Sequence, residues 1–106
     1  MKFIKWHIRI NKKRKNKKGK HPAIVFAESD DGLFYYNLGL THSRKRGHHS
    51  NLEIKDPSDW SKASFIRDDL SIDEKIFLQE IMNDYKLHPS DYKKIWERII
   101  KRKIKK

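Results

Sequence analysis

Apolar and polar residues alternate strictly along residues 3–10, the first patterned segment of the chain. Ile4, Trp6, Ile8 and Ile10 fall on one face, and the residues between them are basic. Because successive side chains of a β-strand point to opposite sides, this period of two predicts a half-buried strand with a basic outer surface.

The next two apolar runs flank an Asp-Gly pair. Residues 23–27 form a continuous apolar run, and residues 33–40 form a second run that is rich in aromatic side chains. The Asp31-Gly32 pair between them is typical of a tight turn. The pattern therefore predicts an antiparallel hairpin.

The last third of the chain changes to helical spacing. Ser71 and Glu74 fit a capping box, and the apolar residues behind them predict a helix over about 72–86. A second helix is expected over about 89–104, with apolar residues on one side and Lys and Arg on the other.

With two further short strands at 52–54 and 63–67, the order is about five strands followed by two helices. This order predicts an α+β fold, either a small SH3-like barrel or a bent antiparallel sheet, with the two C-terminal helices covering it. A chain of 106 residues is close to the commonest domain size, so a single domain over 1–106 is expected.

The positive charge is concentrated in two segments. The chain has 26 Lys and Arg against 14 Asp and Glu, a net charge of +12. Seven of the basic residues lie in 11–20, which we expect to be a loop, and eight lie in 93–106. Dense positive segments favour a polyanion through counterion release, so a nucleic acid is the expected partner, RNA before DNA. An anionic membrane surface is the main alternative.

The composition excludes several classes of protein. Cysteine is absent, which excludes a disulfide framework, a thiol nucleophile and a thiolate metal site. The N-terminus carries charges where a signal peptide needs an apolar core, and no apolar run reaches membrane-spanning length. We therefore expect a cytoplasmic protein that does not associate with a membrane.

Metal and cofactor chemistry is not expected either. His42, His48 and His49 lie in one polar loop, but they lack the spaced pairs that make a zinc signature specific. The acidic pairs are isolated from one another, and there is no phosphate-binding glycine loop. No cofactor is predicted.

A metal-free set of functional groups remains at the predicted strand ends. Lys20 and His21 precede one strand, Thr41 and His42 end another, and Arg67 lies beyond. RNA cleavage needs little more, because the substrate's own 2′-hydroxyl is the nucleophile and the enzyme moves protons and stabilises the phosphate. The alternative is structural: Thr41 caps a loop, and His21 packs beside the proline that follows it.

The order of these motifs resembles that of the PemK/MazF-like endoribonuclease toxins. In 19–26 a glycine and a proline precede an apolar strand, and 38–41 ends a strand on a threonine. A short strand at 51–54 follows, and a serine-bearing strand leads into Ile-Asp-Glu-Lys within 63–75. The likeness keeps its order from about residue 19 to residue 100.

This resemblance implies an SH3-like barrel, usually a homodimer, that cleaves single-stranded RNA without a metal and is neutralised by an acidic antitoxin. The catalytic threonine of the family corresponds to Thr41, and its arginine corresponds to the position of His21. Because that arginine is missing, either His21 carries the proton, or Lys20 or Arg67 supplies the charge, or the activity is lost.

The expected function is a metal-independent endoribonuclease, the toxin of a type II toxin–antitoxin pair, with Thr41, His21 and Arg67 as catalytic residues. The alternative is a non-catalytic, basic nucleic-acid-binding module of the same fold, in which Trp6, Tyr35 and Tyr36 stack on bases. The residues expected to hold nucleic acid are Lys12, Lys13, Arg14, Lys15, Lys17, Lys18, Lys20, His42, Arg44, Lys45 and Arg46.

Binding to single-stranded RNA should depend steeply on salt. Each phosphate contact contributes about 0.7 to the slope of log affinity against log salt, so several contacts give a slope of several units. Affinity measured across a salt series tests this, and deleting residues 12–18 should reduce the slope. A flat dependence would contradict electrostatic binding.

Overall fold

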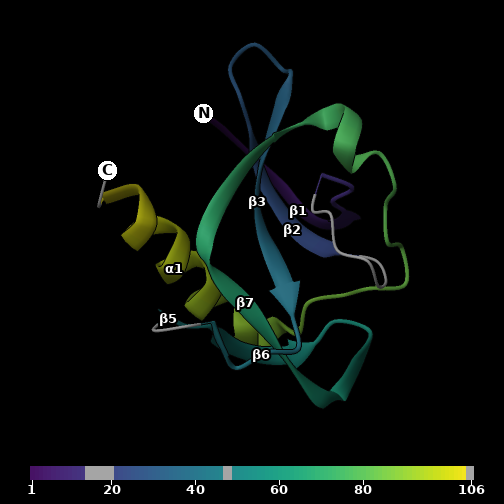
Figure 1. Cartoon of the computed structure of the whole chain (residues 1–106), viewed down its shortest axis with the longest axis vertical. Helices are drawn as coiled ribbons and strands as arrows, with labels where there is room; N and C mark the ends of the chain where they lie inside the picture. Colours follow the sequence, from purple (N-terminus) through teal and green to yellow (C-terminus); the bar gives the residue numbers. More distant parts are fainter. Residues whose placement is uncertain (14–20, 47–48, 105–106) are drawn as a thin grey trace.

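A curled antiparallel sheet of five strands forms the body of the protein, and its strands follow the order β1-β2-β3-β7-β6 (Figure 1). A computed structural model describes residues 1–13, 21–46 and 49–104. The sheet strands are β1 (Lys2–Ile10), β2 (Pro22–Glu28), β3 (Phe34–Thr41), β6 (Leu52–Asp56) and β7 (Asp59–Glu74). The other elements are a small ribbon of β4 (Lys45–Arg46) and β5 (His49–Ser50), two 3-10 turns, η1 (Lys75–Leu78) and η2 (Pro89–Asp91), and the helix α1 (Tyr92–Ile104). The α+β class predicted from the sequence is confirmed.

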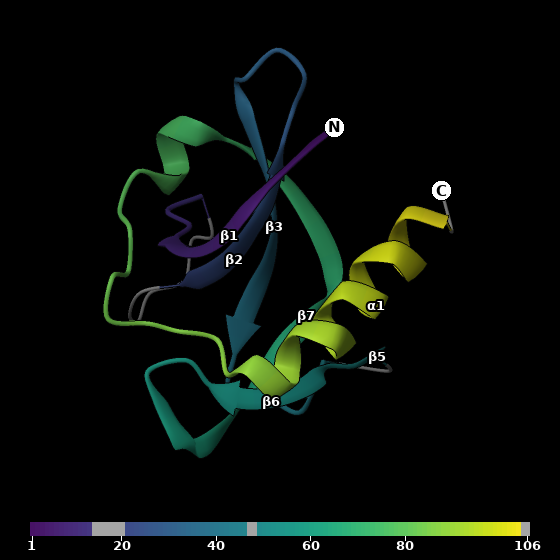
Figure 2. The same cartoon turned by 180° about the vertical axis from the view of Figure 1, so that it is seen from behind.

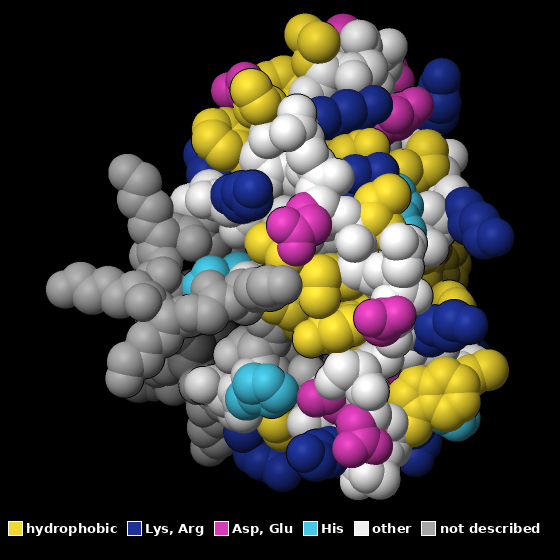
Figure 3. All heavy atoms as spheres, turned by 90° about the vertical axis from the view of Figure 1, so that its right-hand side faces the viewer, with side chains coloured by type: hydrophobic (Ala, Val, Ile, Leu, Met, Phe, Trp, Pro, Cys, Tyr) yellow, Lys and Arg dark blue, Asp and Glu magenta, His cyan; other side chains and the backbone are white. Residues whose placement is uncertain are grey.

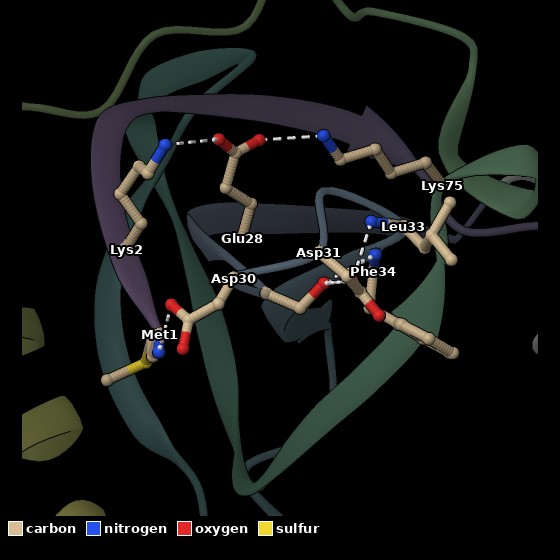
Figure 4. Close-up of polar contacts among 9 residues, drawn as sticks. Met1, Lys2, Glu28, Asp30, Asp31, Leu33, Phe34 and Lys75 are labelled. Carbon is tan, nitrogen blue, oxygen red and sulfur yellow. Dashed lines mark hydrogen bonds and ion pairs between the residues drawn. The ribbon is translucent and has the colours of Figure 1, made fainter.

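The predicted hairpin is formed by β2 and β3, and polar side chains fix its turn (Figure 4). Gly32 has a φ of +76°, a conformation that a residue without a Cβ adopts at low cost. Asp31 accepts hydrogen bonds from the Ser29 hydroxyl at 2.5 Å and from the Leu33 amide at 3.0 Å. These bonds hold the pKa of Asp31 below its usual range.

The strand β2 is buried on both faces, which explains its unbroken apolar sequence. Ile24 and Phe26 belong to the main core, whereas Val25 packs in a second cluster with Leu78 of η1. A strand of alternating apolar and polar residues would have buried polar side chains in one of these two clusters.

The predicted helix over 72–86 is wrong. Residues up to Glu74 continue β7, which is 16 residues long and bends round the sheet from β6 to β3 (Figure 1). The backbone there pairs with β3, and the Ser71 hydroxyl donates to Asp73 at 2.6 Å instead of capping a helix. The helical spacing of the apolar residues was misleading: the face that it predicted to be buried includes Ile76, which is 63% exposed.

Residues 79–88, which we call the strap, follow η1 without helical structure. The Ile10 amide donates to the Glu80 carbonyl at 3.0 Å, and the Met82 amide donates to the Ile8 carbonyl at 2.8 Å. The strap thus pairs with the free edge of β1. Its far end is tied by the Lys86 amide, which donates to the Pro57 carbonyl at 2.9 Å.

The second predicted helix is confirmed as α1, which η2 introduces. Figure 2 shows α1 running across the curled sheet at β6 and β7. Ile95 and Ile99 are buried in the main core with Ile54 of β6 and Ile66 of β7. Within the described ranges a single α-helix therefore closes the sheet, where the sequence pattern had predicted two.

A buried polar cluster joins the ends of β1 and β7 to the middle of β3. One oxygen of Asp73 accepts hydrogen bonds from the Asn11 amide group at 2.9 Å, the Asn37 amide group at 3.0 Å and the Ser71 hydroxyl at 2.6 Å. Lys13 lies 3.8 Å from the other oxygen. Burial raises the pKa of Asp73, but these three hydrogen bonds together lower it by more, so the carboxyl group titrates below its usual range.

Replacing Asp73 by Ala should destabilise the fold by about 3 kcal/mol at neutral pH, because two buried amide groups lose their closest acceptor. The folded pKa is depressed, so the stabilisation is complete above the pKa of an unfolded Asp, about 3.9, and is lost as the pH falls toward the folded value. Urea unfolding at several pH values measures this, and the difference between wild type and Asp73→Ala should shrink with acid. Asp30→Ala is the matched control, since the Asp30 side chain is 85% exposed. Equal losses in the two variants would contradict the prediction.

Candidate functional site

A hollow of about 250 Å³ opens where β2 begins and β3 ends. The antiparallel pairing of Ala23 with Gly39 places the residues before β2 beside the residues that end β3. We call this the histidine hollow; its lining residues are His21, Pro22, Leu40, Thr41, His42, Asp56, Pro57, Ser58, Ser64 and Tyr85. Figure 3 shows the face on which the strap lies, where histidine, apolar and charged side chains are mixed.

His21 contributes a buried ring nitrogen that lacks a hydrogen-bond partner among the described residues. Its backbone is held by the Asn11 amide, which donates to the His21 carbonyl at 2.8 Å. The ring nitrogen Nε2 is buried and has no hydrogen-bond partner among the described residues. Buried polar atoms are nearly always hydrogen-bonded, so an unpaired imidazole nitrogen in a hollow marks a position where a ligand group can complete the bonding. The expectation that His21 merely packs beside Pro22 does not account for this nitrogen.

Thr41 ends β3, and its hydroxyl oxygen accepts a hydrogen bond while its hydroxyl proton can still be donated. Its Oγ1 accepts a hydrogen bond from the Ser43 amide at 3.2 Å, so the predicted loop cap is present. Its carbonyl accepts from the Ser64 hydroxyl at 3.3 Å, which ties the end of β3 to β7. Because a hydroxyl is both donor and acceptor, Thr41 can still donate its proton to a ligand in the hollow.

Asp56 brings a carboxylate into the same hollow. Its side chain is buried, and Oδ1 accepts hydrogen bonds from the Ser58 amide at 2.9 Å and the Ser58 hydroxyl at 2.7 Å. These bonds organise the turn between β6 and β7. Imidazoles, hydroxyls and a carboxylate in one hollow can move protons, which is the chemistry of general acid–base catalysis.

Sequence reasoning missed Asp56, Ser58, Ser64 and Tyr85 as members of this site. Asp56 and Ser58 fall between the two predicted strands at 52–54 and 63–67, and Ser64 lies within the second of them. Tyr85 was assigned to a helix that does not form. The register of the β6–β7 hairpin and the course of the strap, which bring them here, are not visible in any local motif.

Arg67, the third predicted catalytic residue, does not line the histidine hollow. Its Nε lies 3.8 Å from the Asp69 carboxylate, and this buried nitrogen makes no hydrogen bond within the described part of the chain. The structure therefore groups His21, Thr41 and His42, and leaves Arg67 apart from them.

The predicted nucleic-acid-binding residues fall into three groups. Arg44 is engaged with Glu53 at 3.2 Å, and Lys13 lies near Asp73. Lys12 and His42 are exposed. Arg14, Lys15, Lys17, Lys18 and Lys20 lie outside the described residues, as do the side chains of Lys45 and Arg46 in β4.

Two negative findings apply to the described residues 1–13, 21–46 and 49–104. No group of three or more His, Cys, Asp or Glu side chains is arranged there to hold a metal ion. None of the helices within these ranges is long and apolar enough to cross a membrane.

Comparison of the chain with protein-family models, curated proteins and solved structures found no match. The likeness in motif order to PemK/MazF-like toxins therefore remains a prediction from the sequence. The proposal below is argued from the geometry of the histidine hollow.

Proposed function

We propose that this protein is a metal-independent endoribonuclease and that the histidine hollow receives the scissile phosphate of single-stranded RNA. The observation that carries the proposal is the unpaired, buried Nε2 of His21 in a hollow that Thr41 also lines. The order of the sequence motifs adds that the chain is the toxin of a type II toxin–antitoxin pair, with an acidic antitoxin as its protein partner.

RNA phosphodiester cleavage suits this set of groups because the substrate brings its own nucleophile. A base takes the proton of the 2′-hydroxyl, the 2′-oxygen attacks phosphorus, and the 5′-oxygen leaves with a proton, so that a 2′,3′-cyclic phosphate remains. In the proposed site His21 transfers a proton through Nε2, and the Thr41 hydroxyl donates to a phosphate oxygen as negative charge develops. No metal ion is required for either role.

A second candidate, a non-catalytic nucleic-acid-binding module, is favoured by Asp56. This buried carboxylate lines the same hollow and repels a phosphate group that enters it. If that repulsion prevails, the basic segments bind RNA or DNA while the hollow performs no chemistry.

The purified protein should cleave a mixed-sequence RNA in EDTA and leave 2′,3′-cyclic phosphate ends. Thr41→Ala and His21→Ala should each lower the cleavage rate by about a hundredfold, the size typical of one proton-transfer group or one transition-state donor. RNA affinity should change little in either variant. Ser29→Ala, which removes a hydroxyl from the β2–β3 turn, is the control and should cleave at the wild-type rate.

Two results would overturn parts of this proposal. If the wild-type protein binds RNA without cutting it, the non-catalytic module becomes the better function. If it cuts but both hollow variants cut equally well, the active site lies elsewhere.

The variant His21→Arg tests the departure from the toxin family. An imidazole changes charge between pH 5 and 8, whereas a guanidinium stays charged throughout. If His21 transfers a proton, the cleavage rate of the wild type should change across this pH range, and the change should be absent in His21→Arg. His42→Asn, which removes the other imidazole of the hollow, should retain the pH dependence. The same pH profile in the wild type and His21→Arg would show that His21 does not transfer the proton.

A further inference from the structure

A second hollow, of about 340 Å³, shares Tyr85 with the histidine hollow, and its lining includes four aromatic rings. We call it the aromatic hollow; its rings come from Trp6 of β1, Trp60 of β7, Tyr85 of the strap and Tyr92 of α1. Tyr85 lines both hollows, so a ligand that occupies the histidine hollow has the aromatic hollow next to it.

The rings of the aromatic hollow are held in place while part of their surface stays open. The Trp60 indole N–H donates to the Lys86 carbonyl at 2.8 Å, and the ring meets His88 edge-on at 4.6 Å between centroids. Trp60 is nevertheless 45% exposed. Tyr92 is exposed to the same extent, and its ring centroid lies 5.5 Å from that of Trp6. Rings that are already fixed lose little conformational freedom when a flat group stacks on them.

Lysines follow on the other side of Trp60. This residue also lines a third hollow, of about 350 Å³, together with Lys55, Lys62 and Lys94. Lys94 is paired with the buried Asp91 at 3.3 Å. The ammonium groups of Lys55 and Lys62 form no ion pair with any residue that the structure describes, although Glu53 also lines this hollow and the charge of Lys62 acts on Asp59.

We propose that the aromatic hollow is a base-binding subsite for single-stranded RNA, in which a nucleobase near the scissile phosphate stacks on Trp60. This inference rests on the proposed function, because its occupant is the strand that the histidine hollow would cleave. The adjoining features match such a strand: aromatic faces for a base, and lysines beyond them for the next phosphates. An apolar peptide would fit the rings but would leave the lysines without partners.

Of the three aromatic residues that the sequence predicted to stack on bases, the structure leaves only one beside the aromatic hollow. Tyr35 is covered by cations, with the Arg9 guanidinium 5.2 Å and the Lys75 ammonium 4.8 Å from its ring centre. Tyr36 packs against Phe26 in the core. Trp6 lines the aromatic hollow together with Trp60. The sequence did not predict a role for Trp60.

The test compares two eight-residue ligands by fluorescence anisotropy: 2′-O-methyl oligouridylate, which lacks the 2′-hydroxyl needed for cleavage, and the same backbone without bases. Stacking of one base on an aromatic ring is worth about 1–3 kcal/mol, so Trp60→Leu should weaken binding of the oligouridylate by about five- to 150-fold. Binding of the abasic backbone should stay within about twofold of wild type. Trp60→Phe, which keeps a ring, should retain most of the affinity for the oligouridylate.

Ile76→Ala is the control, because Ile76 of η1 is an apolar residue that is 63% exposed and does not line the aromatic hollow. Its binding of both ligands should equal that of wild type, and melting temperatures verify that every variant folds. Tyr92→Leu, on the opposite wall, provides a second test of the same subsite if Trp60→Leu fails to fold. Unchanged oligouridylate binding in the folded variants, or an equal loss for both ligands, would overturn the inference.

The two proposals fail in different ways. Because the oligouridylate cannot be cleaved, its binding reports on the subsite whether or not the protein is an enzyme. Wild-type cleavage with base-independent binding would disprove the subsite and leave the ribonuclease intact. Base-dependent binding that Trp60→Leu abolishes, without any RNA cleavage, would support the subsite and disprove the catalytic role.

Discussion

The burial of β2 on both faces is the constraint on which the rest of the structure depends. Ile24 and Phe26 on one face and Val25 on the other all need an apolar cover. Among the described elements, η1 covers one face and α1 covers the other, and they follow each other in the chain. The polypeptide must therefore pass from one face to the other between them. The strap makes this passage along the free edge of β1. By doing so it brings Tyr85 to the wall shared by the two hollows. The candidate site is therefore a by-product of covering both faces of one strand.

Local patterns predicted the parts of the fold that local contacts decide. The alternation in β1 and the Asp-Gly turn of the hairpin involve neighbours in sequence, and the predicted strand and hairpin both form. The single apolar face predicted for β1 is only partly correct, because the strand register shifts between Phe3 and His7. Ile4 packs in the second cluster, whereas Trp6 and Ile8 belong to the main core. The segment after residue 70 carried a helical pattern as well, but Asp73 binds Asn11 and Asn37, which are 62 and 36 residues away in the chain. Hydrogen bonds between a buried carboxylate and distant partners outweigh a local helical preference. A short stretch of sequence cannot reveal these bonds, because it does not include the partners.

The same distinction separates the parts of the candidate site. His21 and Thr41 were predicted together because the hairpin turn sets the register that brings the two strand ends side by side. Asp56 and Tyr85 reach the hollow through β6 and the strap, whose courses depend on the whole sheet. The net charge of the sequence also overstates the positive charge that is free to bind a ligand. Several described cations are paired with nearby carboxylates, as Arg98 is with Asp68 at 2.8 Å.

The hydrogen bond from the Asn11 amide to the His21 carbonyl has a consequence for evolution. It joins the two ends of the basic segment 12–20, and Asn11 is itself fixed by Asp73. The sheet therefore continues across this junction whatever the sequence between the two residues contains. Lengthening a loop with fixed ends is inexpensive, at about 0.6 kcal/mol for each doubling. Homologous chains can accordingly gain or lose lysines in this segment, and so change their net charge, without repacking the core or displacing His21.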